Sequence, residues 1–133
     1  MYFATHPDFD RDLDKFLHKH HADKACLLRL QNVLTAHFEK RIILPPTILI
    51  PLETVRGHTL YKITMAVEGV RRNQSPRVAL TLLVDNDSAI FLCFGTHIDN
   101  YTTLELTNRA KKRLKEMLDF QNNKDKPDIN EIA

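Results

Sequence analysis

A histidine and a tyrosine lie four residues apart in the segment FGTHIDNYT, where an apolar run gives way to alternating charge. Histidine, with an unperturbed pKa of about 6.5, can accept or donate a proton near neutral pH, so His97 is a candidate for proton transfer. Tyr101 can share in proton transfer or stack on a planar ring. Both also have ordinary explanations, His97 as a strand-end residue that caps the next helix and Tyr101 as an aromatic residue packed at a rim.

Two basic residues, Lys62 and Arg77, stand in segments whose apolar residues alternate with polar ones. This alternation predicts β-strands with one buried face, and it places both cations on the polar faces. A guanidinium can bind phosphate through paired N–H groups, and an ammonium acts as a point charge. The alternative is that both side chains extend to solvent along the edge of a sheet.

Charge is distributed unevenly along the chain, although the formal net charge is only +2. Between Arg56 and Arg77 there are five basic residues and one acid, whereas between Asp8 and Asp23 there are five acids and three bases. The net charge alone does not indicate nucleic-acid binding. The basic middle of the chain, however, is where a polyanionic partner would bind.

The length of 133 residues predicts one domain, which we place at residues 1–120, followed by a polar tail at 121–133. No apolar run approaches the roughly 20 residues that a membrane-spanning helix needs, and the N-terminal segment does not resemble a secretory signal. We therefore expect a cytoplasmic protein that does not contact a membrane. Cys26 and Cys93 have no metal-site or disulfide spacing and are expected to be small buried residues.

The first third of the chain predicts one strand and two helices. The apolar start YFATH predicts an edge strand, and Thr5 and Asp8 have the spacing of a capping box. Helical spacing of apolar residues predicts the first helix at Phe9, Leu13, Phe16 and Leu17. A second helix is predicted from Ala22 to Glu39, and the short junction predicts that the two form an antiparallel hairpin. Four histidines lie on or beside these helices, but their side chains would not converge, so we expect no metal site.

The remainder predicts a connector, three strands and a helix. Pro45 and Pro46 exclude a helix from residues 40–58, which we interpret as the connector. Residues 60–68, 77–85 and 88–95 predict an antiparallel meander whose last strand is apolar on both faces and therefore central. Thr102 and Glu105 have capping-box spacing at the start of the last helix. The expected fold is α+β, in the order β-α-α-β-β-β-α, with the helical hairpin packed on a small antiparallel sheet and a C-terminal helix.

Four short strings follow one another along the chain: LYKI at 60–63, PRVALTLLVDND at 76–87, FGTH at 94–97 with Tyr101 behind it, and NRAKKRLKEML at 108–118. In order and spacing they resemble the RelE/ParE superfamily of small bacterial toxins from type II toxin–antitoxin systems. The third string is similar to the ending of the YafQ branch, and the fourth resembles the helix that closes RelE-type chains. The resemblance covers nearly all of residues 1–120.

This resemblance implies a RelE-like fold and a metal-independent endoribonuclease, with no cofactor, that cleaves mRNA on the ribosome. It also implies a cognate antitoxin as partner. Lys62, Arg77, His97 and Tyr101 match the positions that the family uses for catalysis. In such a reaction a 2′-hydroxyl attacks the neighbouring phosphate, so the site needs a base, an acid and cations for the growing phosphoryl charge. Arg71, Arg72 and His58 are further candidates for contact with RNA.

The chain also departs from the family pattern. Thr64 stands where the RelE branch has a second lysine, and Ile50 stands where the YafQ branch has a histidine. Either His58 replaces a missing histidine or the catalytic set is incomplete. A second hypothesis is therefore a binding protein of the same fold without nuclease activity, either a ParE-like inhibitor of DNA gyrase or an inactive relative. A third is a phage or mobile-element protein that uses the scaffold only for protein contacts.

Overall fold

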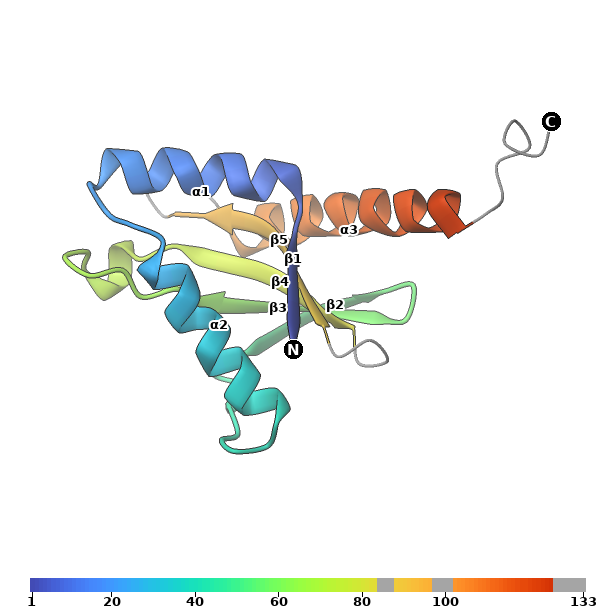
Figure 1. Cartoon of the computed structure of the whole chain (residues 1–133), viewed down its shortest axis with the longest axis horizontal. Coiled ribbons are helices and arrows are strands. Elements are labelled where there is room, and N and C mark those ends of the chain that lie inside the picture. Colours follow the sequence, from blue (N-terminus) through green and yellow to red (C-terminus); the bar gives the residue numbers. More distant parts are fainter. Residues whose placement is uncertain (84–87, 97–101, 126–133) are drawn as a thin grey trace.

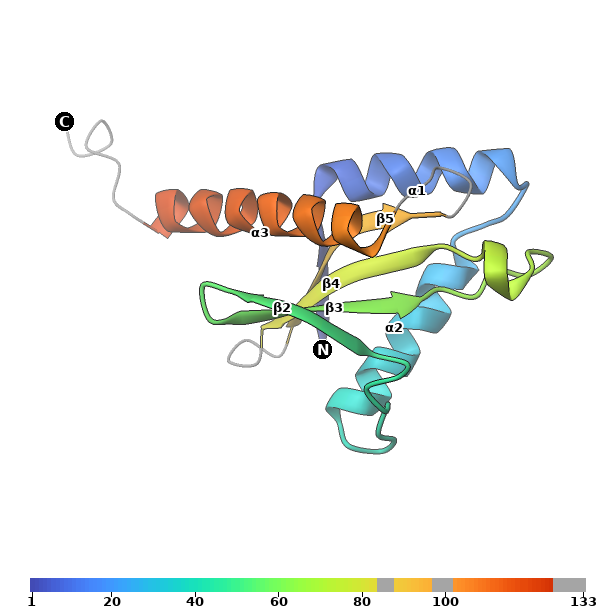
Figure 2. The same ribbon diagram turned by 180° about the vertical axis from the view of Figure 1, so that it is seen from behind.

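The protein is built on a five-stranded sheet that carries helices on both faces (Figures 1 and 2). The computed structural model describes residues 1–83, 88–96 and 102–125, the last five of these by their backbone alone. The elements in chain order are β1 (Tyr2–Thr5), α1 (Pro7–Lys19), α2 (Ala25–Phe38), β2 (Ile50–Val55), β3 (His58–Thr64), the short 3-10 helix η1 (Arg72–Gln74), β4 (Arg77–Leu83), β5 (Ser88–Gly95) and α3 (Thr103–Asp125). The predicted α+β class is confirmed.

The sheet has the strand order β1-β5-β4-β3-β2. Strands β3, β4 and β5 pair antiparallel, as the meander predicted, and β5 has a neighbour on each side. The prediction of a wholly antiparallel sheet is wrong, because β1 pairs parallel with β5. The chain from β1 passes through both helices, β2, β3 and β4 before it reaches β5, which leaves room for the parallel arrangement.

The interpretation of residues 40–58 as a connector is wrong for its second half, where β2 forms the far edge of the sheet. Its pairing with β3 shifts register between Pro51 and Glu53, which breaks the alternation of apolar and polar residues that would have identified a strand. A proline is compatible with this position because an edge strand leaves one row of N–H groups without a strand partner. The order of elements therefore contains one strand more than predicted.

Two hydrophobic clusters occupy the two faces of the sheet. On one face α1 and α2 pack on β3, β4 and β5, and the four predicted stripe residues of α1 are all buried. On the other face α3 packs through Leu106, Ala110 and Leu114. The register of β5 against β4 shifts between Ala79 and Leu80. On β5, Leu92 and Cys93 are adjacent in the sequence, yet both belong to the cluster under α3. Strand β5 is thus buried on both faces, as its composition predicted.

Helix α2 turns back from α1 but slants away from it, so the predicted antiparallel hairpin is only approximate (Figure 1). Its buried residues are Cys26, Leu30 and Leu34, and Val33 from the predicted stripe remains 38% exposed. Helix α3 begins as predicted, because Thr102 Oγ1 accepts a hydrogen bond from the Glu105 N–H at 3.1 Å.

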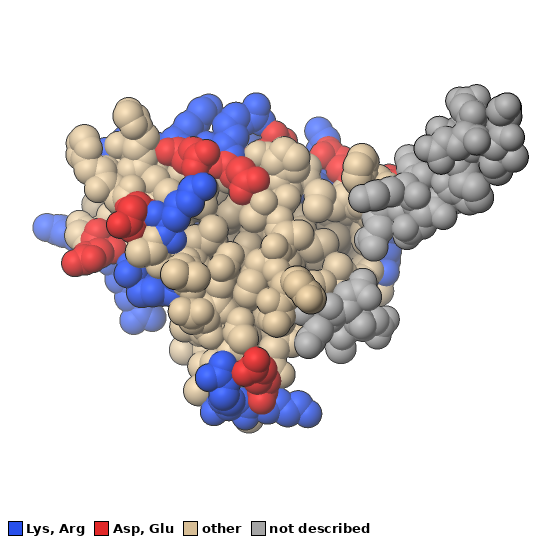
Figure 3. Space-filling model, viewed as in Figure 1, with Lys and Arg blue, Asp and Glu red and all other residues tan. Residues whose placement is uncertain are grey.

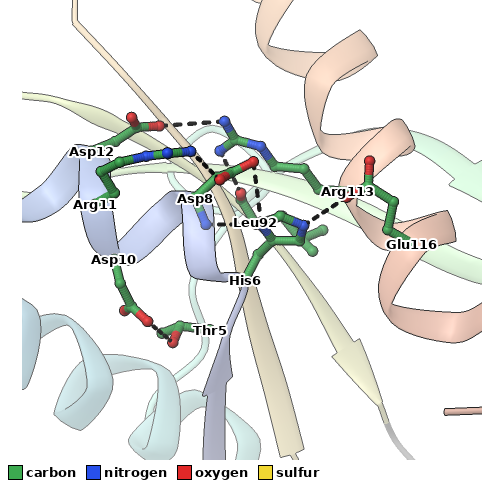
Figure 4. A network of polar contacts seen from close by, with 9 residues as sticks. All are labelled: Thr5, His6, Asp8, Asp10, Arg11, Asp12, Leu92, Arg113 and Glu116. Atoms are coloured by element: carbon green, nitrogen blue, oxygen red, sulfur yellow. Dashed lines mark hydrogen bonds and ion pairs between the residues drawn. The ribbon is translucent and has the colours of Figure 1, made fainter. Parts of the chain in front are cut away.

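The start of α1 differs from the prediction. The cap is His6, whose Nδ1 accepts a hydrogen bond from the Asp8 N–H at 3.0 Å, whereas Thr5 Oγ1 donates to Asp10. A network of polar side chains then joins α1 to α3 around the end of β1 (Figure 4). In it His6 Nε2 contacts Glu116 Oε2 at 2.9 Å, and Arg113 contacts Asp12 at 3.4 Å. Because Nδ1 accepts the helix N–H, the proton of the neutral ring lies on Nε2 and points at Glu116.

Candidate functional site

A small pocket opens beside the start of α3, where β3 and β5 end and β4 begins. Its volume is about 120 Å³, and it is lined by Lys62, Arg77, Gly95, Thr96, Thr102, Thr103 and Leu106. We call it the α3 pocket. The strand pairing explains the convergence, since Arg77 on β4 lies opposite Thr64 on β3 and opposite Gly95 on β5. The two cations predicted on the polar faces of their strands therefore line one pocket.

Lys62 is held toward the first turn of α3. Its Nζ donates a hydrogen bond to Thr103 Oγ1 at 3.1 Å, and the side chain is partly exposed. A lysine with four rotatable bonds would otherwise sample many rotamers at this surface. The bond to Thr103 thus keeps the ammonium group at the mouth of the pocket.

Arg77 is anchored by the loop that precedes its own strand. Its Nη1 donates to the main-chain oxygen of Ser75 at 2.5 Å, and Ser75 Oγ in turn donates to the main-chain oxygen of Arg71. Ser75 is itself buried, so its carbonyl offers a fixed acceptor. One bond to Ser75 uses only part of the guanidinium, which carries five N–H donors.

His97 and Tyr101 lie outside the described residues. Thr96 and Thr102, which line the α3 pocket, are the nearest described residues on either side of them in the sequence. The roles of His97 and Tyr101 therefore stay predictions.

The other three candidates do not line the α3 pocket. His58 begins β3, four residues from Lys62, which corresponds to about 13 Å along an extended strand. Arg71 and Arg72 lie at η1 in the loop between β3 and β4 and are exposed. Arg72 instead lines a separate pocket beside Ile48 and Ile50. Replacement of a missing catalytic histidine by His58 is therefore not supported by its position.

Within the described part of the chain, the α3 pocket supplies cations and hydroxyl groups but no carboxylate or imidazole. Two cations together with the N–H groups at the start of a helix form a positive surface that suits a phosphate. An acid or base for proton transfer would have to come from outside the described lining. The chemistry that the described residues support is thus the binding of a phosphodiester and the stabilisation of charge on it.

The two cysteines are free and buried, as predicted. Burial raises the pKa of the Cys93 thiol, and it also raises the pKa of the Cys26 thiol. A raised pKa keeps both groups protonated at neutral pH and disfavours the nucleophilic thiolate. Among the described residues, no three His, Cys, Asp or Glu side chains are grouped so as to hold a metal ion.

Comparison with protein-family models, curated proteins and solved structures found no match to the chain. In the described ranges, no helix has the length and apolar character needed to cross a membrane.

Proposed function

We propose that this protein is the toxin of a type II toxin–antitoxin system with a RelE-like fold, and that it cleaves mRNA on the ribosome without a metal ion. The observation that carries the proposal is the convergence of Lys62 and Arg77, from adjacent strands, on the α3 pocket. These are the two described residues that match the family's catalytic positions. A cognate antitoxin would be the natural protein partner.

In the proposed reaction the RNA phosphate binds in the α3 pocket between Lys62 and Arg77. The 2′-hydroxyl attacks the phosphorus, a base takes its proton, and an acid protonates the departing 5′-oxygen. The products are a 2′,3′-cyclic phosphate and a 5′-hydroxyl. Lys62 and Arg77 stabilise the charge that grows on the phosphoryl oxygens, while His97 and Tyr101 supply proton transfer and stacking.

The test is a purified translation reaction to which the protein is added, with cuts in the mRNA mapped by primer extension. Lys62→Met, Arg77→Met and His97→Ala should each lower the cleavage rate by about 10²-fold or more. His18→Ala is the matched control, because it changes an exposed histidine on α1 that is not a candidate for the site. Full activity of both Arg77→Met and His97→Ala would refute the assignment of the site.

The second candidate is a binding protein without nuclease activity, either a gyrase inhibitor or an inactive relative. It is favoured by the lack of any acid or base among the described lining residues of the α3 pocket. The discriminating measurement adds the protein to a DNA supercoiling reaction and to the translation reaction in parallel. Intact mRNA with blocked supercoiling would establish gyrase inhibition, and no effect in either reaction would favour the inactive relative.

A further inference from the structure

A second concave surface lies beside α2. Two adjoining pockets of about 320 and 380 Å³ share the lining residues Ile48, Thr64 and Ala66. The first pocket reaches Leu30, Val33 and Ile63, and the second reaches Ile50 and Val70. The pockets adjoin at these shared residues, and we call the two together the α2 groove.

Exposed apolar side chains gather at this groove. Val33 is 38% exposed and Ile48 is 46% exposed, and both line it. The segment that leads from α2 to Ile48 adds Ile42 at 44% and Ile43 at 81% exposure. Figure 3 shows a broad uncharged area over α2, between charged groups at the two ends of the helix. Apolar exposure concentrated in one place indicates a binding surface.

The charges that line the groove are all positive. Arg29 lines the first pocket and Arg72 lines the second, and no acid of the described ranges lines either pocket. Neither guanidinium has a hydrogen-bond or ion-pair partner among the described residues. This contrasts with Arg11, Arg41, Arg56 and Arg113, which are each paired with a carboxylate.

Two neighbouring cations strengthen the same pattern. Lys40, just past the end of α2, and Arg71, beside Arg72, are exposed and likewise have no side-chain partner in the described part of the chain. Acids lie near the groove as well: Asp23 and Glu68 line a further hollow that Arg29 also lines, and Glu39 at the end of α2 is paired with Arg41. The groove itself is an apolar floor with unpaired cations at both ends.

This arrangement selects among possible occupants. A second copy of the chain that packs through the same groove would bring the same cations against Arg29 and Arg72, and like charges in an interface disfavour association. A purely apolar small molecule would leave both guanidinium groups unused. A protein segment whose apolar side chains are flanked by carboxylates fills the apolar floor and pairs with both arginines.

We propose that the α2 groove is a docking site for a protein segment in which apolar side chains are flanked by Asp or Glu. The first pocket of the groove contains buried residues of the face that α1 and α2 cover. The second pocket is lined by Ile50 and Thr64, which pair with Lys62 and Arg77, so that end of the groove adjoins the α3 pocket. The proposal does not depend on ribonuclease activity, and it holds for a nuclease and for a binding protein alike.

The test is selection of a display library of random 12-residue peptides on the immobilised full chain, with Ile48→Asp protein for counter-selection. Enriched peptides are then synthesised with a fluorescent label, and their affinity is measured by anisotropy. We expect apolar residues flanked by Asp or Glu. Binding should weaken at least tenfold with the double variant Arg29→Gln/Arg72→Gln and be lost with Val33→Asp.

Two matched controls separate the groove from general effects. Leu28→Asp alters a residue of α2 that is 58% exposed and lines neither pocket of the groove, and Lys112→Gln removes an exposed cation on α3. Both should bind the peptides as the wild type does. Circular dichroism checks that each variant is folded, and the double glutamine variant, which alters only exposed side chains, keeps the test valid if Val33→Asp unfolds.

Three results would overturn the proposal. Enriched peptides could be neutral or basic, or they could bind the double glutamine variant as tightly as the wild type. Light scattering could also show a dimer that Ile48→Asp converts to a monomer, which would make a second copy the occupant. The assays for mRNA cleavage and supercoiling are separate from the peptide-binding assay. Failure of the docking proposal therefore does not contradict the proposed function, and failure of the proposed function does not contradict the docking proposal.

Discussion

Arg113 on α3 donates a hydrogen bond from Nη1 to the main-chain oxygen of Leu92 on β5 at 2.9 Å (Figure 4). Its Nη2 lies 3.4 Å from Asp12 on α1, so one guanidinium connects the two helices and the strand between them. Arg113 is only 8% exposed, and Leu92 is fully buried. Leu92 lies just past Phe91, the last residue of β5 that pairs with β1. The arginine therefore satisfies a buried carbonyl at the point where pairing with β1 ends.

Replacement of Arg113 by methionine should lower the free energy of unfolding by about 1–3 kcal/mol, because the buried Leu92 oxygen loses its partner. Loss of the contact with Asp12 adds less, since that carboxylate is partly exposed and screened by solvent. Urea denaturation measures the change. Lys112→Met, at the exposed neighbouring position, should stay within about 0.5 kcal/mol of the wild type. Equal stability of the two variants would contradict a structural role for Arg113.

His6 provides a second test of the same region, because its Nδ1 caps α1 and its Nε2 contacts Glu116. His6→Ala removes both bonds and should cost about 1–2 kcal/mol of unfolding free energy. His6→Asn keeps a side-chain oxygen that can accept the Asp8 N–H, so it should recover about half of that loss. The comparison by denaturation is decisive: equal losses in the two variants would show that capping of α1 contributes nothing.

The strands that carry the α3 pocket could be predicted from the sequence because their apolar residues alternate. That alternation placed Lys62 and Arg77 on polar faces, and both line the α3 pocket. Strand β2 could not be identified in the same way, because the register shift after Pro51 interrupts its alternation. The parallel pairing of β1 with β5 was also missed, since alternation along a strand says nothing about its neighbour.

Local rules for helix starts succeeded at one helix and failed at another. Thr102 caps α3 as its spacing with Glu105 predicted. At α1 the same rule pointed to Thr5, but the cap is His6, a residue type that capping preferences rank low. His58 shows that closeness in the sequence does not imply closeness in space. It is four residues from Lys62, but both lie on one extended strand, which separates their side chains.

Cys93 predicts how stability changes in alkali. Burial raises its pKa above the ordinary value of 9.0, so the folded protein keeps the thiol protonated where the unfolded chain loses the proton. The resulting stabilisation is complete below about pH 9 and is lost as the pH rises toward the folded-state pKa. Between these limits, wild type should lose up to about 1.4 kcal/mol per pH unit relative to Cys93→Ala. Both proteins contain Cys26, so its contribution to the pH dependence of stability cancels in the comparison. Parallel stability curves for the two proteins up to pH 10.5 would show that the Cys93 pKa is not raised.

Thr103 gives a prediction about activity that rests on the proposed ribonuclease function. Its Oγ1 accepts the bond from Lys62 Nζ, so Thr103→Val should release the ammonium group and slow mRNA cleavage about 5- to 10-fold. Thr103→Ser retains the hydroxyl group and should cleave at nearly the wild-type rate. Both variants should be as stable as the wild type within about 0.5 kcal/mol, because Thr103 is exposed. Single-turnover cleavage of a saturating RNA measures the rate, and a serine variant as slow as the valine variant would show that Thr103 does not act through its hydroxyl group on Lys62.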